Sequence, residues 1–383
     1  MYKTKLCALT LLAGLSLNTF AQAVPKPDHV VILMLENYSY GDIIGNTNAP
    51  YLNSLVSDPD AALFTQSFAL THPSQPNYVM LFSGGNQGIY TDAISSSTPF
   101  STCNLGASLI SSGYSFAGYS EGLPSVGSLT STSGTYARKH CPWTNWQGTG
   151  TNQLPGSVGQ MFTSFPTTAA TFSTLPTVSF VIPNLDDDMH NPTVYSGGNY
   201  SVTAISNGDT WVQNNMANYI AWAKAHNSLF IVTFDEDDSF GPNQILTMFI
   251  GQMVQAGSYS TSINHYSVLR TLEDMYGLTY CDSSAYANTI NFCWKATTGI
   301  EEFRIMNSKF KIYPNPVTSM LNIQMSQDDN LKIAEVEVQN TLGETLLHNS
   351  EIVNQKCTLD VSALQAGIYF IKTNQGIQKF IKQ

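Results

Sequence analysis

The sequence Ser228-Leu-Phe-Ile-Val-Thr-Phe-Asp235-Glu-Asp-Asp238 joins an apolar run to four consecutive carboxylates. The β-branched and aromatic residues of this run predict a buried parallel strand. In open α/β sheets, ligands bind outside the carboxyl ends of the strands, which is where these four acidic residues lie. Adjacent carboxylates repel one another unless protons or a cation neutralise them. A divalent metal ion would do so, and an exposed acidic turn is the alternative interpretation.

Two other segments repeat this pattern of a buried run that ends on polar groups. The run at 28–35 is followed by Glu36 and Asn37. The run at 177–182 is followed by Pro183-Asn-Leu-Asp-Asp-Asp-Met-His190. At least three strands therefore end in side chains that could bind a metal ion or a phosphate group.

A serine lies at the predicted start of a helix. A strand predicted at 64–70 leads into Thr71-His-Pro-Ser-Gln-Pro-Asn-Tyr78, and the apolar residues that follow indicate a helix. Pro76 fits the first turn, where its missing N–H is tolerated. Ser74 then lies at or just before the N-terminus, where free N–H groups and the helix dipole favour an anion. A purely structural role as an N-cap is the alternative.

The remaining elements complete an α/β pattern. We expect a short helix at 50–56, strands at 114–119 and 244–250, and a loop at 122–134 followed by the basic Arg138-Lys-His140. Apolar spacing predicts a helix from Thr210 to His226 capped by Asp209, and a second one at 265–276 that Gly277 ends. Alternating strands and helices predict a layered, mostly parallel sheet flanked by helices.

The acidic residues are concentrated in a few places. From Val24 to Ile300 there are six Lys or Arg residues against eighteen Asp or Glu residues. Such a surface repels nucleic acid and anionic membranes. Seven of the eighteen carboxylates lie at 186–188 and 235–238, which indicates a local function rather than general solubility.

The first 23 residues have the features of a secretory signal. Lys3 and Lys5 precede an apolar stretch at 6–17, and Ala21-Gln-Ala23 supplies the small residues of a cleavage site. The stretch is too short to span a bilayer, and no later segment is continuous enough. We therefore expect an exported protein that is soluble once mature.

Four cysteines remain in the main body, and in an exported domain they predict two disulfides. Three pairings are compatible with the sequence, of which Cys103–Cys141 with Cys281–Cys293 closes the shortest loops. Cys357 lies near the C-terminus. No CxxC or Cys/His spacing indicates a structural zinc site.

The organisation changes after Ile300. Short runs of period-two alternation, such as Leu321-Asn-Ile-Gln-Met and Gly367-Ile-Tyr-Phe-Ile-Lys, are separated by turn residues. This spacing predicts a small all-β sandwich at 309–383, joined by a linker at 301–308 to a main domain at 24–300.

The main body, from about His29 to Gly277, resembles the bacterial and fungal phosphoesterase family that includes acid phosphatases and phospholipases C, relatives of the alkaline-phosphatase superfamily. The resemblance depends on five motifs in order: Glu36-Asn37-Tyr-Ser-Tyr, His72-Pro-Ser-Gln-Pro-Asn-Tyr78, Pro183-Asn184 with Asp188-Met-His190, Thr233-Phe-Asp-Glu-Asp237 and Asn264-His265-Tyr-Ser. It implies an alkaline-phosphatase-like α/β fold.

The same resemblance implies a divalent metal ion bound through oxygen, the ligand atom of hard cations. The implied ligands are Glu36, Asn37, Ser74, Asp235 and Glu236. Ser74 matches the position of the family nucleophile, whose metal-bound hydroxyl loses its proton more readily and attacks phosphorus.

Three further residues match positions with a chemical role. His190 and His265 would hold the phosphoryl oxygens or protonate the leaving group, and Asp188 would orient His190. If Asp186 and His190 act together as ligands, they could form a second metal site with His265. The resemblance therefore implies one divalent ion, or two if that site exists.

The resemblance implies hydrolysis of phosphate monoesters through a phosphoserine intermediate on Ser74. The compact main body is nearer to the acid-phosphatase-like members than to the longer lipid-cleaving ones. The substrate would be a phosphorylated small molecule or a phospholipid headgroup. A phospholipase C-type phosphodiesterase is the enzymatic alternative. A calcium-stabilised surface adhesin or glycan-binding protein is the non-enzymatic one, and it would have no use for the Ser74 hydroxyl.

The tail resembles the C-terminal sorting domain of Bacteroidetes proteins exported by the type IX (Por) system. The matching segments are Tyr313-Pro-Asn-Pro, Leu321-Asn-Ile, Leu342-Gly343, Gly367-Ile-Tyr-Phe and Lys379-Phe-Ile-Lys. This implies the type IX machinery as a partner, then release or anchoring at the cell surface. A generic β-sandwich binding module is the alternative.

Overall fold

The computed structural model describes residues 24–191, 201–295, 310–325, 336–341, 343–349, 356–373 and 376–383. The chain divides into two compact units, Met1–Ala296 and Thr297–Gln383. The predicted secretory signal at 1–23 and the predicted linker at 301–308 lie outside the described residues.

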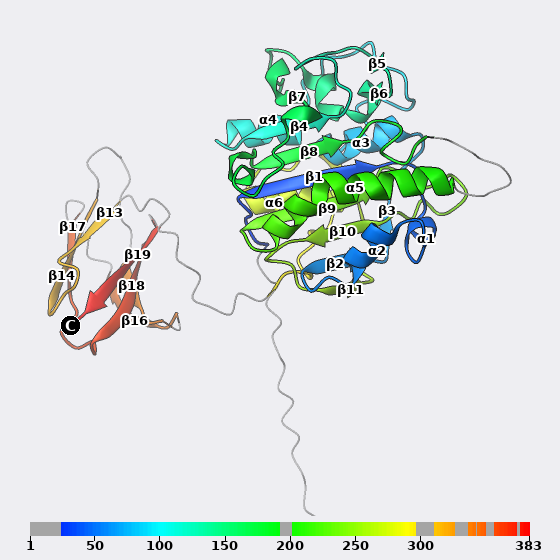
Figure 1. The fold of residues 1–383 in the computed structure, drawn as a ribbon. Coiled ribbons are helices and arrows are strands. Elements are labelled where there is room, and N and C mark those ends of the chain that lie inside the picture. Colours follow the sequence, from blue (N-terminus) through cyan, green and yellow to red (C-terminus); the bar gives the residue numbers. More distant parts are fainter. Residues whose placement is uncertain are drawn as a thin grey trace, which may run out of the picture. The chain divides into compact units, whose positions relative to one another are not determined.

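An eight-stranded sheet forms the centre of the first unit, with the strand order β11-β2-β10-β9-β1-β8-β4-β7 (Figure 1). The paired strands are parallel except at β10, which is antiparallel to both β9 and β2. The prediction of a mostly parallel sheet is confirmed. Its strands are β1 (His29–Leu35), β2 (Ala61–Phe64), β4 (Phe116–Ser120), β7 (Gly159–Met161), β8 (Val178–Ile182), β9 (Ser228–Phe234), β10 (Thr247–Ile250) and β11 (Gly257–Tyr259).

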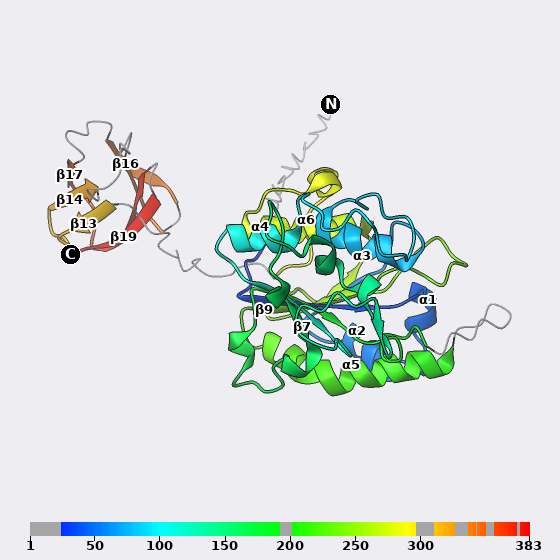
Figure 2. The same ribbon diagram turned by 90° about the horizontal axis from the view of Figure 1, so that it is seen from above.

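Helices cover both faces of this sheet (Figure 2). Along β1, alternate residues beginning at Val30 pack into a core with α3, α4 and α6. The residues between them, beginning at Val31, pack into a second core with α2 and α5. This period of two explains why the apolar run is continuous, because both of its faces are buried. The helices are α1 (Tyr40–Ile43), α2 (Pro50–Val56), α3 (Ser74–Ser83), α4 (Leu105–Ser111), α5 (Val202–Ala223) and α6 (His265–Tyr276).

Short elements occupy the connections between these layers. Two small two-stranded pairs join β3 (Ser67–Phe68) with β12 (Ile263–Asn264), and β5 (Thr132–Ser133) with β6 (Tyr136–Ala137). The short 3-10 helices are η1 (Arg138–His140), η2 (Pro142–Trp146), η3 (Gly156–Val158), η4 (Phe162–Ser164), η5 (Phe172–Thr174) and η6 (Asp282–Tyr286).

The described residues of the second unit form two antiparallel sheets, with the orders β13-β14-β17 and β16-β15-β18-β19. Both sheets contribute to one apolar core, in which Leu321 of β14 and Val338 of β15 are fully buried. The predicted all-β fold of this region is confirmed. Its strands are β13 (Phe310–Tyr313), β14 (Met320–Met325), β15 (Val336–Gln339), β16 (Thr345–Asn349), β17 (Lys356–Asp360), β18 (Gly367–Thr373) and β19 (Gly376–Lys382).

Two element predictions differ from the structure. The helix predicted from Thr210 begins earlier, at Val202, and its N-cap is Ser201, whose side chain accepts the N–H of Ala204. Asp209, predicted as the cap, is buried inside α5 and accepts the N–H groups of Tyr51 and Leu52 at the start of α2. The strand predicted at 64–70 is two short strands, β2 and β3, in different sheets.

The prediction of two disulfides was wrong for the described residues. They contain one disulfide, Cys103–Cys281, which joins positions 178 residues apart. Cys141 and Cys293 are free and buried. The fold brings both bonded sulfurs next to the hydroxyl of Ser108 on α4, at 3.7 and 3.9 Å. Cys141 instead lies 3.0 Å from the hydroxyl of Ser120.

Among the described helices, each is too short or too polar to cross a membrane.

Candidate active site

The carboxyl ends of β1 and β9 place two acidic residues side by side. The strands pair in parallel with Leu35 opposite Phe234, so Glu36 and Asp235 follow directly from paired positions. Asp235 N–H donates to the Leu35 carbonyl over 3.1 Å, and Glu36 N–H donates to the Asp188 carbonyl over 2.8 Å. Asp188 lies in the loop after β8, the other neighbour of β1. Three adjacent strands therefore bring carboxylates to one edge of the sheet.

The hydroxyl of Ser74 lies in this cluster. Ser74 is the first residue of α3 and is 2% exposed. Its Oγ lies 3.1 Å from Glu36 Oε2 and 3.1 Å from Glu236 Oε1. One hydroxyl proton can serve only one of these carboxylates at a time. The residue that matches the family nucleophile is thus in contact with two of the predicted metal ligands.

Asn37 links the remaining predicted ligands. Its backbone has φ 53°, a conformation that asparagine adopts more readily than most residues. Its Nδ2 donates to Glu236 Oε1 over 2.7 Å, and its backbone N–H donates to Asp235 Oδ1 over 3.2 Å. The five residues predicted to bind a metal ion therefore form one connected group.

The last two carboxylates of the acidic run have a structural role. Asp237 accepts the N–H groups of Ser239 and Asn243 at 2.8 and 2.7 Å. Asp238 accepts the hydroxyl of Ser39 at 2.9 Å. These bonds fix the loop that follows β9. The run is therefore divided between a pair beside Ser74 and a pair that holds a turn, and Asp237 of the second pair also lies 3.3 Å from His72 Nε2.

His140, which the sequence did not identify as a site residue, lies between two of the carboxylates. Its Nε2 is 3.0 Å from Glu36 Oε1 and its Nδ1 is 3.5 Å from Asp188 Oδ2. The distance to Glu36 is that of an ion pair, although the ring is not aligned for a hydrogen bond. The one signal in the sequence was the basic Arg138-Lys-His140 within an acidic domain. Its partners are more than forty positions away, so spacing could not indicate them.

Burial and repulsion shift the pKa values of these groups. Burial raises the pKa of Glu236 to about 8, and the charge of Glu36 adds to this shift. Burial likewise raises the pKa of Asp188 to about 6 and that of Asp235 well above its usual range. Burial would also raise the pKa of Glu36, but the charge of His140 lowers it to about 2. For His140, burial lowers the pKa, yet Glu36 and Asp188 raise it to about 9.

The three consecutive aspartates after β8 differ in exposure. Asp188 is fully buried, whereas Asp186 is exposed and accepts an Asn191 side-chain N–H at 3.1 Å. Asp188 Oδ1 accepts the backbone N–H of His190 at 2.8 Å, and the His190 ring lies 3.2 Å from Asn191 Oδ1. Asp188 therefore contacts the backbone of His190, while its other oxygen faces the ring of His140.

His265 supports the acidic strand end from α6. It is 1% exposed, and its Nε2 donates to the carbonyl of Asp235 over 2.8 Å. Because a carbonyl can only accept, the proton of the neutral ring is on Nε2. Burial lowers the pKa of His265 to about 4, so the ring is neutral near neutral pH. His265 Nε2 is therefore hydrogen-bonded to the main chain of Asp235.

The cluster has the properties of a divalent metal site. Its carboxylate, amide and hydroxyl oxygens are the donors that hard cations prefer. Several buried oxygens in the described part of the chain have no hydrogen-bond partner, and two of those in this cluster, Asn37 Oδ1 and Asp235 Oδ2, have no ion-pair partner either. A cation would satisfy both and would offset the repulsion between the carboxylates. Ligand atoms of Glu36, His140 and Asp188 also lie within 4.8 Å of one another, a second grouping that could hold an ion.

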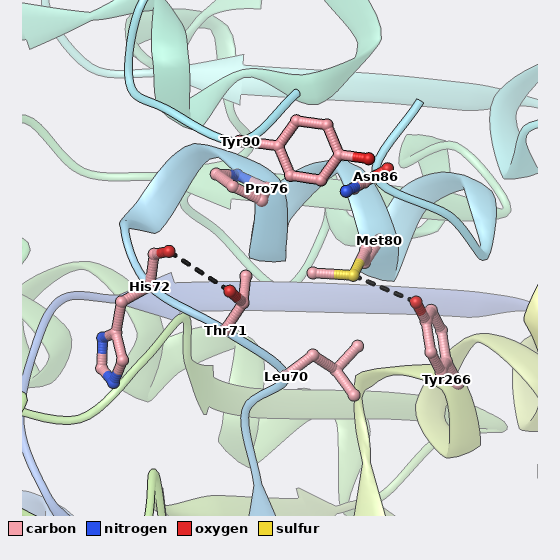
Figure 3. A pocket seen from close by; sticks show the side chains of 8 residues that line it. All are labelled: Leu70, Thr71, His72, Pro76, Met80, Asn86, Tyr90 and Tyr266. Carbon is pink, nitrogen blue, oxygen red and sulfur yellow. Dashed lines mark hydrogen bonds between the residues drawn. The ribbon is translucent and has the colours of Figure 1, made fainter. Parts of the chain in front are cut away.

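A pocket of about 240 Å³ lies along the start of α3 (Figure 3). His72 belongs to both the pocket and the cluster, because its Nδ1 is 2.6 Å from Glu236 Oε2. The hydroxyl of Tyr266 donates to Met80 Sδ over 3.0 Å and closes one side. The ring of Tyr90, which is 72% exposed, lies at the rim. The other lining residues are Leu70, Thr71, Pro76 and Asn86.

Comparisons with known proteins identify the two parts of the chain. Residues 47–279 match the phosphoesterase family, and residues 311–383 match a secretion system C-terminal sorting domain. The chain is similar to a phosphatidylinositol-3-phosphatase of Mycobacterium tuberculosis, with 43% identity over 282 residues, 72% of this chain and 85% of that protein. It is also 25% identical to an acid phosphatase of Aspergillus fumigatus, over 69% of this chain and 56% of that protein.

A solved structure from Vibrio parahaemolyticus, a protein in the alkaline phosphatase superfamily, has a TM-score of 0.48 and 13% identity, covering 81% of this chain and 80% of that one. The sorting domain indicates type IX secretion and a secreted or cell-surface location. The family match indicates a hydrolase of phosphoric esters that is similar to acid phosphatases, and not the adhesin of the alternative interpretation. The chain belongs to the phosphoesterase family.

Proposed function

We propose that the first unit hydrolyses phosphate monoesters through a phosphoserine intermediate on Ser74. The observation that supports this most directly is the position of the Ser74 hydroxyl. It is buried at the first residue of α3 and lies 3.1 Å from a carboxylate oxygen of Glu36 and from one of Glu236. A serine that only capped the helix would not need two acidic neighbours.

In the first step, Ser74 Oγ attacks phosphorus and forms an Oγ–P bond, while the bond from phosphorus to the alcohol oxygen breaks. The hydroxyl proton passes to a neighbouring carboxylate, and the departing alcohol takes a proton. His190, whose ring is half-buried, is our candidate for that donor, because the Nε2 proton of His265 is occupied by the Asp235 carbonyl. In the second step, His190 takes a proton from the water that attacks phosphorus, the Oγ–P bond breaks, Ser74 Oγ regains its proton from the carboxylate, and inorganic phosphate leaves.

Glu36, Asn37, Ser74, Asp235 and Glu236 would hold the divalent ion. When bound, it would lower the pKa of the Ser74 hydroxyl and neutralise charge on the phosphoryl group. In this proposal His140 is not a ligand. Its positive charge pairs with the carboxylates of Glu36 and Asp188.

We further propose that the alcohol part of the substrate occupies the pocket beside His72. Aliphatic and aromatic side chains line much of it, and Thr71 and Asn86 supply polar groups. The relatives are named as phosphatases, which favours a monoester over the diester of a phospholipase C. The name of the mycobacterial relative adds a phosphorylated lipid headgroup to the candidates. Export would use the signal proposed at 1–23 and the type IX machinery.

The experiment that tests this function replaces Ser74 with alanine. We expect Ser74→Ala to abolish hydrolysis of p-nitrophenyl phosphate, because the variant lacks the proposed nucleophile. Thermal unfolding and elemental analysis should show an intact fold and a bound metal ion retained by the four remaining ligands. Ser111→Ala, on the exposed end of α4, is the matched control and should keep full activity.

Two results would contradict the proposal. Hydrolysis by Ser74→Ala at a rate close to that of the unsubstituted protein would exclude the nucleophile. Full turnover by protein that chelation has freed of metal would exclude the ligand group. A substrate panel of mononucleotides, sugar phosphates, phosphatidylinositol 3-phosphate and phosphatidylcholine would separate a monoesterase from a diesterase.

A further inference from the structure

A lysine next to His140 reaches the start of the Ser74 helix through an aspartate. Lys139 Nζ lies 2.7 Å from Asp92 Oδ2. The other oxygen of the same carboxylate, Asp92 Oδ1, accepts the backbone N–H of Gln75 at 3.0 Å. Gln75 directly follows Ser74 in α3. One carboxylate therefore bridges a lysine ammonium and the N–H group adjacent to the proposed nucleophile.

Lys139 also lies in the electric field of the acidic cluster. Burial would lower the pKa of Lys139, but the charges of Glu36, Asp92 and Asp235 raise it above its usual value. The other five basic residues between Val24 and Ile300 contact different partners. These pairs are Lys26 with Tyr114, Arg138 with Thr144, Lys224 with Asp58, Arg270 with Asp274 and Lys295 with Asp60.

A phosphate group can accept the same two hydrogen bonds as the Asp92 carboxylate, one from the Lys139 ammonium and one from the Gln75 N–H. Both are anions whose oxygens accept charge-assisted hydrogen bonds from an ammonium group and from an N–H. The positive end of the helix dipole adds to the attraction. The side chain of Asp92 is 38% exposed, so it can move into water without leaving a buried charge unpaired. That of Lys139 is 19% exposed and is held more closely.

We propose that Lys139 and the Gln75 N–H bind two non-bridging oxygens of the substrate phosphate, and that the phosphate displaces Asp92 from them. This inference rests on the proposed function, because it places the phosphate at Ser74. Asp92 acts as an internal competitor: it keeps Lys139 next to the site while no substrate is bound. The group recognised is a phosphate monoester dianion, whether its alcohol is soluble or part of a lipid.

The two partners of this ion pair should have opposite effects on phosphate binding. The probe is inorganic phosphate, titrated by calorimetry into the metal-loaded full-length protein. We expect Lys139→Met to weaken phosphate binding by about tenfold or more, since it removes a charged donor. We expect Asp92→Ala to tighten binding about three- to tenfold, since it removes the competitor. Asp92→Asn keeps an acceptor for Gln75 N–H without the charge, and should give a smaller increase.

Lys224→Met is the matched control, because Lys224 forms a similar ion pair with Asp58, at 2.5 Å, away from the site. It should leave phosphate affinity unchanged. If Asp92→Ala weakens phosphate binding as much as Lys139→Met does, Asp92 positions the lysine, and the proposal that phosphate displaces Asp92 is overturned. Unchanged affinity in folded Lys139→Met would exclude Lys139 as a ligand of phosphate. Calorimetry does not depend on turnover, so it separates these outcomes from a failure of the proposed function, which hydrolysis by the unsubstituted protein tests.

Discussion

Tyr78 and His140 contact the same atom, Oε1 of Glu36, from two stacked rings. The Tyr78 hydroxyl donates to this oxygen over 2.5 Å, and His140 Nε2 lies 3.0 Å from it. The ring centroids are 5.0 Å apart and the ring planes differ by 10°. Glu36 is therefore fixed from one side by a hydroxyl and a positive charge. Its other oxygen, Oε2, remains with Ser74.

This arrangement predicts the effect of replacing His140. We expect His140→Gln to reduce kcat for p-nitrophenyl phosphate by about 10- to 100-fold, the usual effect of losing a residue that orients metal ligands. The metal content should be retained, because His140 is a charge partner of the ligands in our proposal. His226→Gln, at an exposed histidine next to Trp222, is the control and should have no effect. Loss of the metal from folded His140→Gln would instead make His140 a ligand.

The pocket beside His72 predicts a separate effect on substrate affinity. Tyr90→Ala should raise KM for p-nitrophenyl phosphate about three- to tenfold, because an aromatic contact contributes about 1 kcal/mol. Inhibition by inorganic phosphate should not change, since phosphate has no alcohol part. Tyr286, which is 92% exposed on η6, provides the control variant Tyr286→Ala. An equal change in KM and in phosphate inhibition would argue against the pocket as the site of the alcohol.

A buried carboxyl on α6 predicts part of the pH dependence of stability. Burial raises the pKa of Glu273 to about 7, despite hydrogen bonds from Ser284 and from the Cys281 N–H. The folded state therefore favours the protonated form. This contribution is complete below the unfolded pKa of about 4.3 and is lost as the pH rises through 7. Each pH unit in that window lowers the free energy of unfolding by up to about 1.4 kcal/mol.

Glu273→Gln should remove this slope, because an amide does not titrate. Its Nε2 can donate to the Ser284 hydroxyl, which also donates to the Cys281 carbonyl. Urea unfolding at pH 5 and pH 8 measures the difference for both proteins. An identical pH dependence in the two proteins would show that Glu273 is not the titrating group.

The disulfide between Cys103 and Cys281 predicts the response to reducing agents. It closes a loop of 178 residues, and the double variant Cys103→Ser, Cys281→Ser should lower the free energy of unfolding by about 2–4 kcal/mol. Reduced unsubstituted protein should unfold at the urea concentration of the double variant, and the variant should not respond to reductant. Denaturation midpoints unaffected by both changes would mean that the bond does not stabilise this unit.

The strands of the main sheet could be predicted because their signals are local. Continuous apolar runs ending on polar residues identified β1, β8 and β9, and the spacing in α6 gave both of its ends. The prediction that Asp209 caps the N-terminus of α5 is wrong. Asp209 precedes the apolar stripe of that helix, but its carboxylate accepts N–H groups at the start of α2. That contact spans more than 150 positions, so periodicity within one helix could not reveal it. The cysteine pairing failed for the same reason.

The acidic residues of the candidate site could be predicted from the sequence, whereas its basic residues could not. Glu36, Asp235 and Glu236 follow strands, and strand ends can be recognised one at a time. His140 and Lys139 come from a 3-10 turn in a region rich in Ser, Thr and Gly, where no element fixes their direction in advance. Only the packing of that turn against α3 brings them to the acidic strand ends.

Glu36 and Asp235 directly follow paired residues of β1 and β9. The pairing of the two strands therefore fixes the separation between these two acidic residues. Loops around the site can lengthen or shorten without altering the separation of these two side chains. A deletion of one residue within either strand, by contrast, would turn its acidic end toward the opposite layer of helices, because side chains alternate along a strand. We therefore expect insertions and deletions to be tolerated in the loops around these residues, whereas the lengths of β1 and β9 should stay constant.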